Sequence, residues 1–190
     1  MFFKLIYRLL VCSLILFFLN LKPSFGIEDG FGSAKKIKSK HFTIYCAQDI
    51  EVTTLIQQLD IGSSDKLLAG KPMDEKNSSQ AELADMLDTL FMRVCNILDM
   101  PLYSFQGNIK ICKDIAQLAT IYYNLFNKEL HAPSFYVFDF NTIYVSLENF
   151  KRQIVGHEIA HAIISRYFVV LPPIKVQEIL AGYVEYQLRK

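Results

Sequence analysis

The sequence lacks the features that would divide it into several units or give it a large charge of one sign. It has no long linker rich in proline, serine or glycine and no internal repeat, so one domain is expected. Its 20 basic and 19 acidic side chains give a formal net charge of +1. Without residues 1–26, which hold three basic and no acidic side chains, the charge is 17 − 19 = −2. This balance does not indicate a nucleic-acid partner.

Cysteine is scarce, and none of the four cysteines has the paired spacing of a structural zinc site. If Cys12 is lost with the N-terminal segment, three remain, and an odd number leaves at least one unpaired in a monomer. Cys46 and Cys112 end two expected strands, so a disulfide between them is possible if those strands are neighbours. Cys95 lies in an apolar helical segment and is expected to be a buried free thiol.

The first 26 residues have the pattern of a secretory signal. Lys4 and Arg8 precede an apolar run at residues 9–19, and Ser24 and Gly26 are small residues at the −3 and −1 positions of a cleavage site. An uncleaved anchor is the alternative, but the run is shorter than the roughly 20 residues that span a bilayer. We therefore expect an exported protein, periplasmic or secreted, with residues 27–190 as a single domain and no stable membrane span.

Periodicity along the remaining chain predicts an α+β arrangement with a mixed sheet whose strand order the sequence does not determine. The lysine-rich run from Lys35 to Lys40 is expected to be a solvated lead-in to the first strand, and His41 a surface residue. The expected strands are residues 41–46, residues 108–112 and a β-rich stretch over 135–145 with a turn near 139–141. The expected helices are residues 49–60, 80–99 and 114–127, with a polar loop at 62–79.

The residues that carry chemistry are in the segment His157-Glu158-Ile159-Ala160-His161. It lies in an expected helix over residues 146–168 that Ser146 could cap. Two histidines four residues apart share one helix face, so both imidazoles can bind one metal ion at about 2.0–2.1 Å. Glu158 lies about 100° round the helix, outside the ligand set, where it can take a proton from a water activated by the metal.

A catalytic zinc takes three protein ligands, so one more is needed. The first helix is followed by residues 169–173, where two prolines force a turn, and then by a second apolar-periodic helix over 174–189. The two helices can pack antiparallel. Glu178, near the start of the second helix, is the expected third ligand, and Glu185, seven residues further along the same face, is the rival.

These residues resemble the gluzincin zinc metallopeptidases, a peptidase MA-like group: HEIAH, a turn, then Glu178 in an E-x-x-A-x-Y setting with Ala181 and Tyr183. The resemblance implies a zincin-like fold, in which a mixed sheet packs against the HExxH helix and the following ligand helix. It also implies one Zn²⁺ per chain, held by two histidines and Glu178, and a peptide or protein substrate. Thermolysin-like members carry an acid four residues after the ligand glutamate, where this chain has Gly182, so the partner that orients a zinc histidine is unassigned.

In zincins, the strand just ahead of the active helix commonly borders the cleft and pairs with extended substrate. The segment Thr142, Ile143, Tyr144 and Val145 resembles that strand, although an ordinary buried strand is an equal alternative. A side chain that stabilises the oxyanion is also needed, and no single residue stands out. The candidates are His131, Tyr136, Tyr144 and Tyr183.

The sequence therefore predicts an exported zinc metallopeptidase with His157, His161 and Glu178 as metal ligands and Glu158 as general base. The alternative comes from another functional class. Because few residues follow Glu178, the chain could be a zinc-stabilised binding module with little or no activity.

Overall fold

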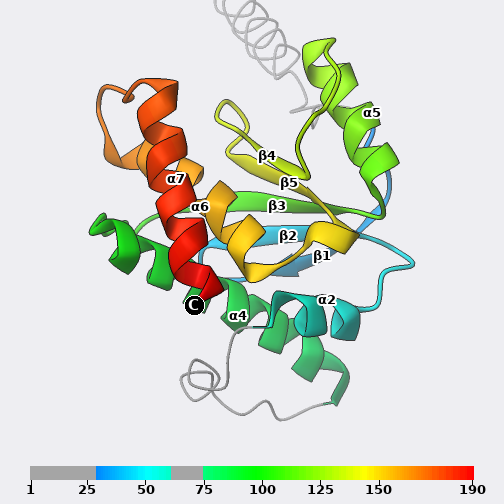
Figure 1. Ribbon diagram of the computed structural model, residues 1–190. Coiled ribbons are helices and arrows are strands. Elements are labelled where there is room, and N and C mark those ends of the chain that lie inside the picture. Colours follow the sequence, from blue (N-terminus) through cyan, green and yellow to red (C-terminus); the bar gives the residue numbers. More distant parts are fainter. Residues whose placement is uncertain (1–28, 61–74) are drawn as a thin grey trace, which may run out of the picture.

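A computed structural model describes residues 29–60 and 75–190 of the chain. This part is α+β, with one five-stranded mixed sheet and five α-helices (Figure 1). The predicted signal at residues 1–26 and most of the predicted polar loop, residues 61–74, lie outside the described residues. Of the helices described, none combines the length and the apolar character that crossing a bilayer requires.

The sheet has the strand order β1-β2-β3-β5-β4. Its three inner strands, β2, β3 and β5, run parallel, and the two outer strands, β1 and β4, are antiparallel to their neighbours. The mixed sheet is thus confirmed. The strand bounds are Ala34–Lys38 for β1, Phe42–Ala47 for β2, Gly107–Cys112 for β3, Ser134–Val137 for β4 and Thr142–Ser146 for β5.

The two faces of the sheet are covered unequally (Figure 1). Four helices pack on one face and bury a row of isoleucines, Ile44, Ile109 and Ile143, that the strand register aligns. On the other face a single helix, α5, contributes Leu118 and Ile121 to a smaller cluster. The helices of the first face are α2 (Val52–Leu59), α4 (Glu75–Leu98), α6 (Arg152–Tyr167) and α7 (Ile174–Arg189), and α5 spans Ile115–Phe126.

The lysine-rich run is a strand, and its prediction as a solvated lead-in was wrong. Lys35, Lys36 and Lys38 lie in β1, with Ile37 buried between them and paired with Ile44 of β2. β1 is an edge strand, where lysines hinder pairing with a second sheet. Three lysines around a single isoleucine, after an alanine, are too weak a period-2 pattern to predict a strand.

His41 was also predicted incorrectly. Its residue exposure is 2%, and its ring stacks on Phe91 with the ring centroids 4.3 Å apart. Phe91 belongs to α4, which is distant in sequence, so the charged neighbours of His41 gave no sign of this contact.

The possible disulfide between Cys46 and Cys112 does not form, although their strands are neighbours. Cys46 is opposite Ile111 in the register, so Cys112, one residue further on, points to the opposite face of the sheet. The two thiols accordingly belong to different apolar clusters. Cys95 is a buried free thiol, as predicted.

The helix that carries the HEIAH segment begins later than expected. Ser146 is buried at the end of β5, where it is opposite Cys112, so it continues the sheet and does not cap the helix. A 3₁₀ turn at Leu147–Asn149 follows, and the fully buried Phe150 anchors the chain before α6 starts at Arg152. The HEIAH segment therefore lies in the middle of α6.

Candidate metal centre

The two C-terminal helices pack closely enough for side chains of both to meet around one point. Gly156 of α6 makes this possible, because a Cβ atom there would lie 2.1 Å from Cδ1 of Leu188 on α7. Ala181, Val184 and Leu188 form the buried side of α7 that faces this contact. A short loop joins the helices, so the expected antiparallel pair is observed (Figure 1).

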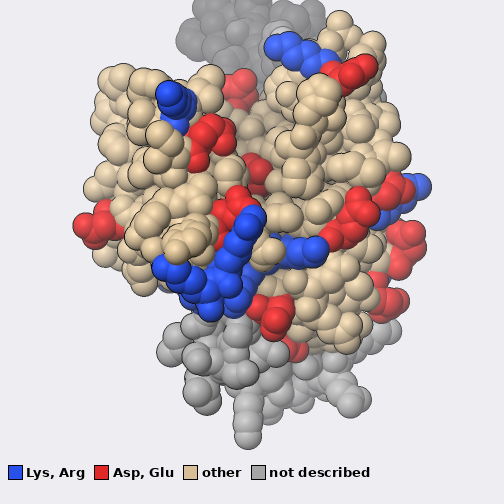
Figure 2. Space-filling view, viewed as in Figure 1, with Lys and Arg blue, Asp and Glu red and all other residues tan. Residues whose placement is uncertain are grey.

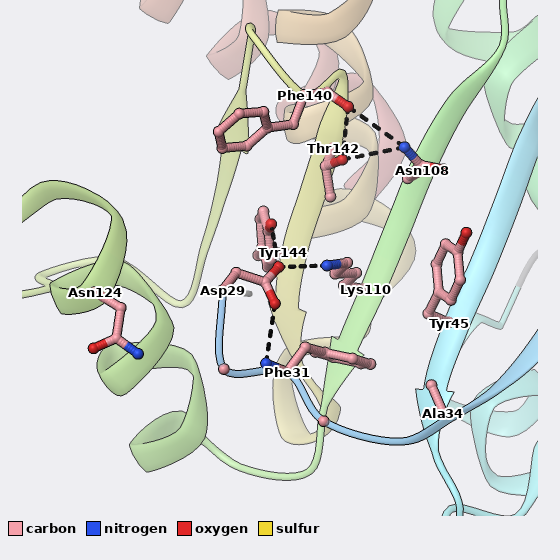
Figure 3. Close-up of a pocket in the computed structure, with 12 residues that line it drawn as sticks. Asp29, Phe31, Ala34, Tyr45, Asn108, Lys110, Asn124, Phe140, Thr142 and Tyr144 are labelled. Carbon is pink, nitrogen blue, oxygen red and sulfur yellow. Dashed lines mark hydrogen bonds and ion pairs between the residues drawn. The ribbon is translucent and has the colours of Figure 1, made fainter. Parts of the chain in front are cut away.

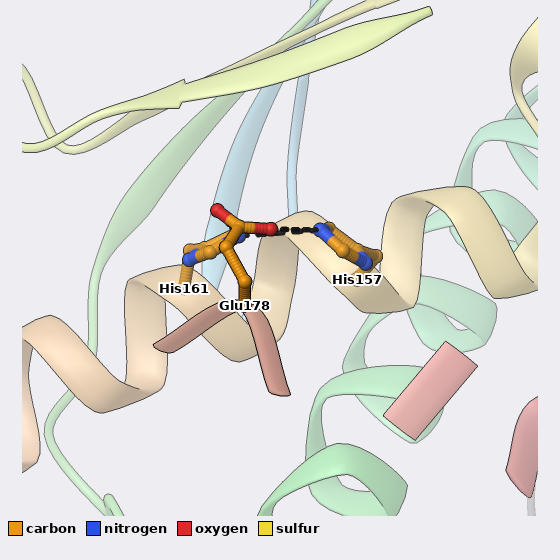
Figure 4. Close-up of side chains that lie close together, drawn as sticks. All are labelled: His157, His161 and Glu178. Carbon is orange, nitrogen blue, oxygen red and sulfur yellow. Dashed lines mark hydrogen bonds and ion pairs between the residues drawn. The ribbon is translucent and has the colours of Figure 1, made fainter. Parts of the chain in front are cut away.

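His157 and His161 of α6 and Glu178 of α7 point toward one another (Figure 4). The two histidine Nε2 atoms are 3.2 Å apart. The carboxylate of Glu178 lies 3.6 Å from Nε2 of His157 and 3.4 Å from Nε2 of His161. All the potential ligand atoms are within 4.8 Å of one another. These residues, which the sequence singled out, could therefore hold a metal ion.

The distances between these atoms can be compared with those in a tetrahedral metal site. Two ligand atoms at about 2.0–2.1 Å from a tetrahedral zinc are about 3.3 Å apart. The two Nε2 atoms, 3.2 Å apart, lie close to that length, and each has a different oxygen of Glu178 nearby, Oε2 at 3.6 Å from His157 and Oε1 at 3.4 Å from His161. Three ligands leave one tetrahedral position open, which is the arrangement of a catalytic zinc site.

The electrostatics of the three side chains also suit a metal. Burial lowers the pKa of His161 and the neighbouring His157 adds to this effect, whereas the carboxylate of Glu178 opposes it. The net direction favours the neutral imidazole, which is the form that binds metals. The carboxylate of Glu178 is the exposed member of the group, with 55% of its side chain accessible, and it supplies a negative charge.

Glu185, the rival ligand, contacts the other side of the same histidine. Its carboxylate lies 3.3 Å from Nδ1 of His157, within ion-pair distance although not aligned as a hydrogen bond, and it also pairs with Arg189. A carboxylate at the second nitrogen of a metal-binding histidine fixes the orientation of the ring. Position 182, where thermolysin-like enzymes carry such an acid, faces open space here. Glu185, one turn later, is therefore the candidate for the partner that the sequence left unassigned.

Glu158 is buried beside the triad, with 5% of its surface exposed. Its Oε1 accepts a hydrogen bond of 2.7 Å from the hydroxyl of Ser134 on β4. Burial raises the pKa of Glu158 to about 7; the Ser134 hydrogen bond opposes the rise, and the carboxylates of Glu178 and Glu185 add to it. A carboxylate with a pKa near neutrality can both accept and release a proton.

Ser134 was not among the sequence candidates. It lies 24 residues before Glu158 on a four-residue strand, in no motif with the metal-binding helix. Only the pairing of β4 with β5 brings it to this position, so no local signal could have identified it.

The triad and Glu158 line a cavity of about 390 Å³ between α6, the start of α7 and β4. Apolar and aromatic side chains form much of the remaining wall. They include Tyr136 of β4, Phe138 after it, and Leu171 in the loop between the two helices.

The strand that borders this cavity is β4, not β5 as predicted. β5 pairs with β3 on one side and β4 on the other, so Thr142, Ile143, Tyr144 and Val145 have no free edge to pair with a peptide. No described strand pairs with the outer edge of β4. An extended peptide could add to the sheet there. The sequence identified a strand leading to the active helix but could not give its place in the sheet.

Of the four candidate oxyanion donors, only Tyr136 lines the cavity that contains the triad. His131 and Tyr183 are exposed and do not line the cavity. Tyr136 does line it, and its hydroxyl lies 2.8 Å from Oδ1 of Asn141 and 3.1 Å from Oγ of Ser165. Tyr144 points to the opposite face of the sheet, so it cannot reach the triad.

On that opposite face Tyr144 helps to line a second, larger hollow of about 740 Å³ (Figure 3). Its hydroxyl donates to the buried carboxylate of Asp29 at 2.6 Å, and the Lys110 ammonium and the backbone N–H of Phe31 donate to the same group. Burial alone would raise the pKa of Asp29, but these hydrogen bonds outweigh it and lower the pKa. The cluster ties the segment before β1 to β3 and β5.

Comparison of the chain with protein-family models, with curated proteins and with solved structures found no match in any of the three. The functional argument therefore depends on the geometry of the site.

Proposed function

We propose that this protein is an exported, zinc-dependent metallopeptidase of zincin-like fold. One observation carries the proposal. Two histidines and a glutamate lie close enough together to hold one metal ion, and a buried carboxylate with a pKa of about 7 lies in the same cavity. Neither feature alone would indicate peptide hydrolysis, but hydrolysis of an amide by water needs both an electrophilic centre and a base.

In this proposal His157, His161 and Glu178 hold one Zn²⁺, and Glu185 keeps the His157 ring in place. When bound, zinc would supply Lewis acidity toward a water molecule and the scissile carbonyl. Glu158 takes the proton that the attacking water loses and passes it to the departing amine.

The hydroxyl of Ser134 holds one carboxylate oxygen of Glu158 by its 2.7 Å hydrogen bond. This bond restricts the rotation of the carboxylate, and the second oxygen remains to accept the proton. Ser134 is therefore a positioning residue for the base, and its own hydroxyl need not exchange a proton with the substrate.

The shape of the cavity supports a peptide or protein substrate. The free edge of β4 offers main-chain hydrogen-bonding groups next to the triad, and such groups bind an extended peptide largely irrespective of its sequence. Phe138 and Leu171 line the cavity, which favours an apolar side chain near the cleaved bond.

A zinc-stabilised binding module is the second candidate. The triad joins α6 to α7, and α7 buries only one side, so a bound metal would stabilise this helix pair whether or not catalysis occurs. The two candidates agree on metal binding and differ only in turnover.

The test is metal content followed by proteolysis. Purified protein should bind close to one zinc per chain, and His157→Ala should abolish binding because it removes one of three ligands. His131→Ala is the matched control, since His131 is exposed and outside the cavity, and it should keep the metal. The loaded protein should cleave an unstructured polypeptide, and a chelator should stop cleavage. Native zinc affinity in His157→Ala would refute the site.

A further inference from the structure

The loop between α6 and α7 and the outer side of α7 carry an unusual number of exposed apolar side chains. Val169 is 103% exposed and Val170 82%, so the loop protrudes fully into solvent. On α7, Ile174 and Ile179 are 76% and 62% exposed, and Tyr183 and Tyr186 are about half exposed. We call these six residues the α7 outer face. A contiguous exposed apolar surface of this kind normally marks an interaction site.

The helical spacing shows that this exposure is systematic. Ile179, Tyr183 and Tyr186 recur at intervals of four and three, so they form one stripe along the helix. The opposite stripe is Ala181, Val184 and Leu188, which is buried against the rest of the protein. α7 is therefore apolar on both sides, and only its inner side has a partner among the described residues.

A lysine lies at each end of the α7 outer face. The two acidic residues of α7, Glu178 and Glu185, both turn toward the metal-binding histidines. Lys175 lies at the start of the helix and Lys190 at its end, with the Lys190 ammonium 4.4 Å from the centroid of the Tyr186 ring. The space-filling view shows basic and acidic side chains beside uncharged surface over the upper part of α7, and a group of basic side chains below it (Figure 2).

We infer that the α7 outer face docks on an anionic lipid surface. A protruding apolar tip, tyrosines along the flank and lysines at both ends are the composition of segments that lie in a bilayer interface. Lysines next to such a surface are attracted to anionic headgroups.

Docking in this way would bring the metal cavity to the lipid surface, because Leu171 of the same loop lines that cavity. The inference concerns a surface and not a reaction, so it does not depend on the proposed function.

The chain contains no tryptophan, which allows a direct test. Val170→Trp in the full chain places a single fluorophore at the tip of the loop. Tyr123→Trp is the matched control: Tyr123 is 56% exposed but lies on α5, on the other face of the sheet. Each variant is mixed with vesicles of phosphatidylcholine and phosphatidylglycerol, with and without brominated acyl chains. The control also corrects for any attachment through residues 1–28, which would bring both variants to the vesicle.

Val170→Trp should shift its emission to shorter wavelength and be quenched by the brominated lipid, and both changes should weaken without phosphatidylglycerol or in high salt. Tyr123→Trp should show neither change. If Val170→Trp does not fold, Ile179→Trp should give the same result from the same face. Equal quenching of both positions, or none at the tip, would overturn the inference. A shift that appears without vesicles as protein concentration rises would also overturn it, in favour of a second copy of the chain.

Discussion

The two faces of the sheet each bury a carboxylate, and the two carboxylates have opposite environments. Asp29 accepts hydrogen bonds from an ammonium, a phenol and a backbone N–H, and its pKa is lowered. Glu158 accepts one hydrogen bond, from Ser134, and burial raises its pKa to about 7. A lowered pKa keeps Asp29 charged at neutral pH, whereas Glu158 is poised to exchange a proton.

The difference in environment indicates that Asp29 stabilises the fold, whereas Glu158 is suited to accepting and releasing a proton. The hydrogen bonds of Asp29 are internal and involve parts of the chain far apart in sequence, so it stabilises the fold. Glu158 is less completely bonded, close to two other carboxylates and next to a potential metal site, which is the pattern of a group whose proton affinity is tuned for function. Loss of Asp29 should therefore affect stability, and loss of the acids on the other face should affect metal binding or turnover.

The largest effect should come from the ligand carboxylate. Glu178→Ala removes one of three ligands and should abolish or severely weaken zinc binding. Glu185→Ala removes only the partner of His157 Nδ1, so the metal should be retained with an affinity about 10–100-fold lower. Competitive titration with a chromophoric chelator measures both. Tighter zinc binding by Glu178→Ala than by Glu185→Ala would exchange their roles.

Asp29→Asn should destabilise the fold by about 2–4 kcal/mol, because it leaves the Lys110 ammonium without its counter-charge. The estimate is at the lower end of the usual range, since 20% of the Lys110 side chain is exposed. Asp139→Asn, at an exposed turn, should change stability by less than about 0.5 kcal/mol. Denaturant unfolding of both variants provides the comparison. An unchanged midpoint for Asp29→Asn would show that the cluster contributes nothing.

The pH dependence of stability should have opposite signs for the two carboxylates. The folded-state pKa of Glu158 is raised from 4.5 to about 7, so its contribution favours folding at low pH and is lost as pH rises through that interval, by about 3 kcal/mol at most. The pKa of Asp29 is lowered from 3.8, so its contribution is present above that value and is lost as pH falls below it.

The measurement is the free energy of unfolding of metal-free wild type and Glu158→Gln between pH 4.5 and pH 8. The difference between the two proteins isolates Glu158, because His161 titrates in both. A difference that does not vary with pH would show that Glu158 is not a perturbed carboxylate.

The clustering of the candidate metal ligands could be predicted because its information is local. His157, Glu158 and His161 share one helical turn, and a single short loop separates them from Glu178, so helix geometry alone brings them together. The α+β class and most helices could be predicted from periodicity for the same reason.

What could not be predicted depends on contacts between distant segments. The hydrogen bond from Ser134 to Glu158, the interior position of β5 and the opposite orientations of Cys46 and Cys112 all follow from strand order and register. A single sequence contains no periodic signal for either property. The burial of His41 against Phe91 likewise depends on how α4 lies on the sheet.

The most direct measurement is peptide cleavage by wild type and Glu158→Gln at matched zinc occupancy. Glutamine keeps the shape of the side chain and can still accept the Ser134 hydrogen bond, but it cannot take up the proton. Zinc content should therefore be unchanged, and turnover should fall by a factor on the order of 10²–10⁴. Equal, non-zero rates in the two proteins would contradict the proposed mechanism, and no cleavage of a broad peptide library by zinc-loaded wild type would favour the binding module.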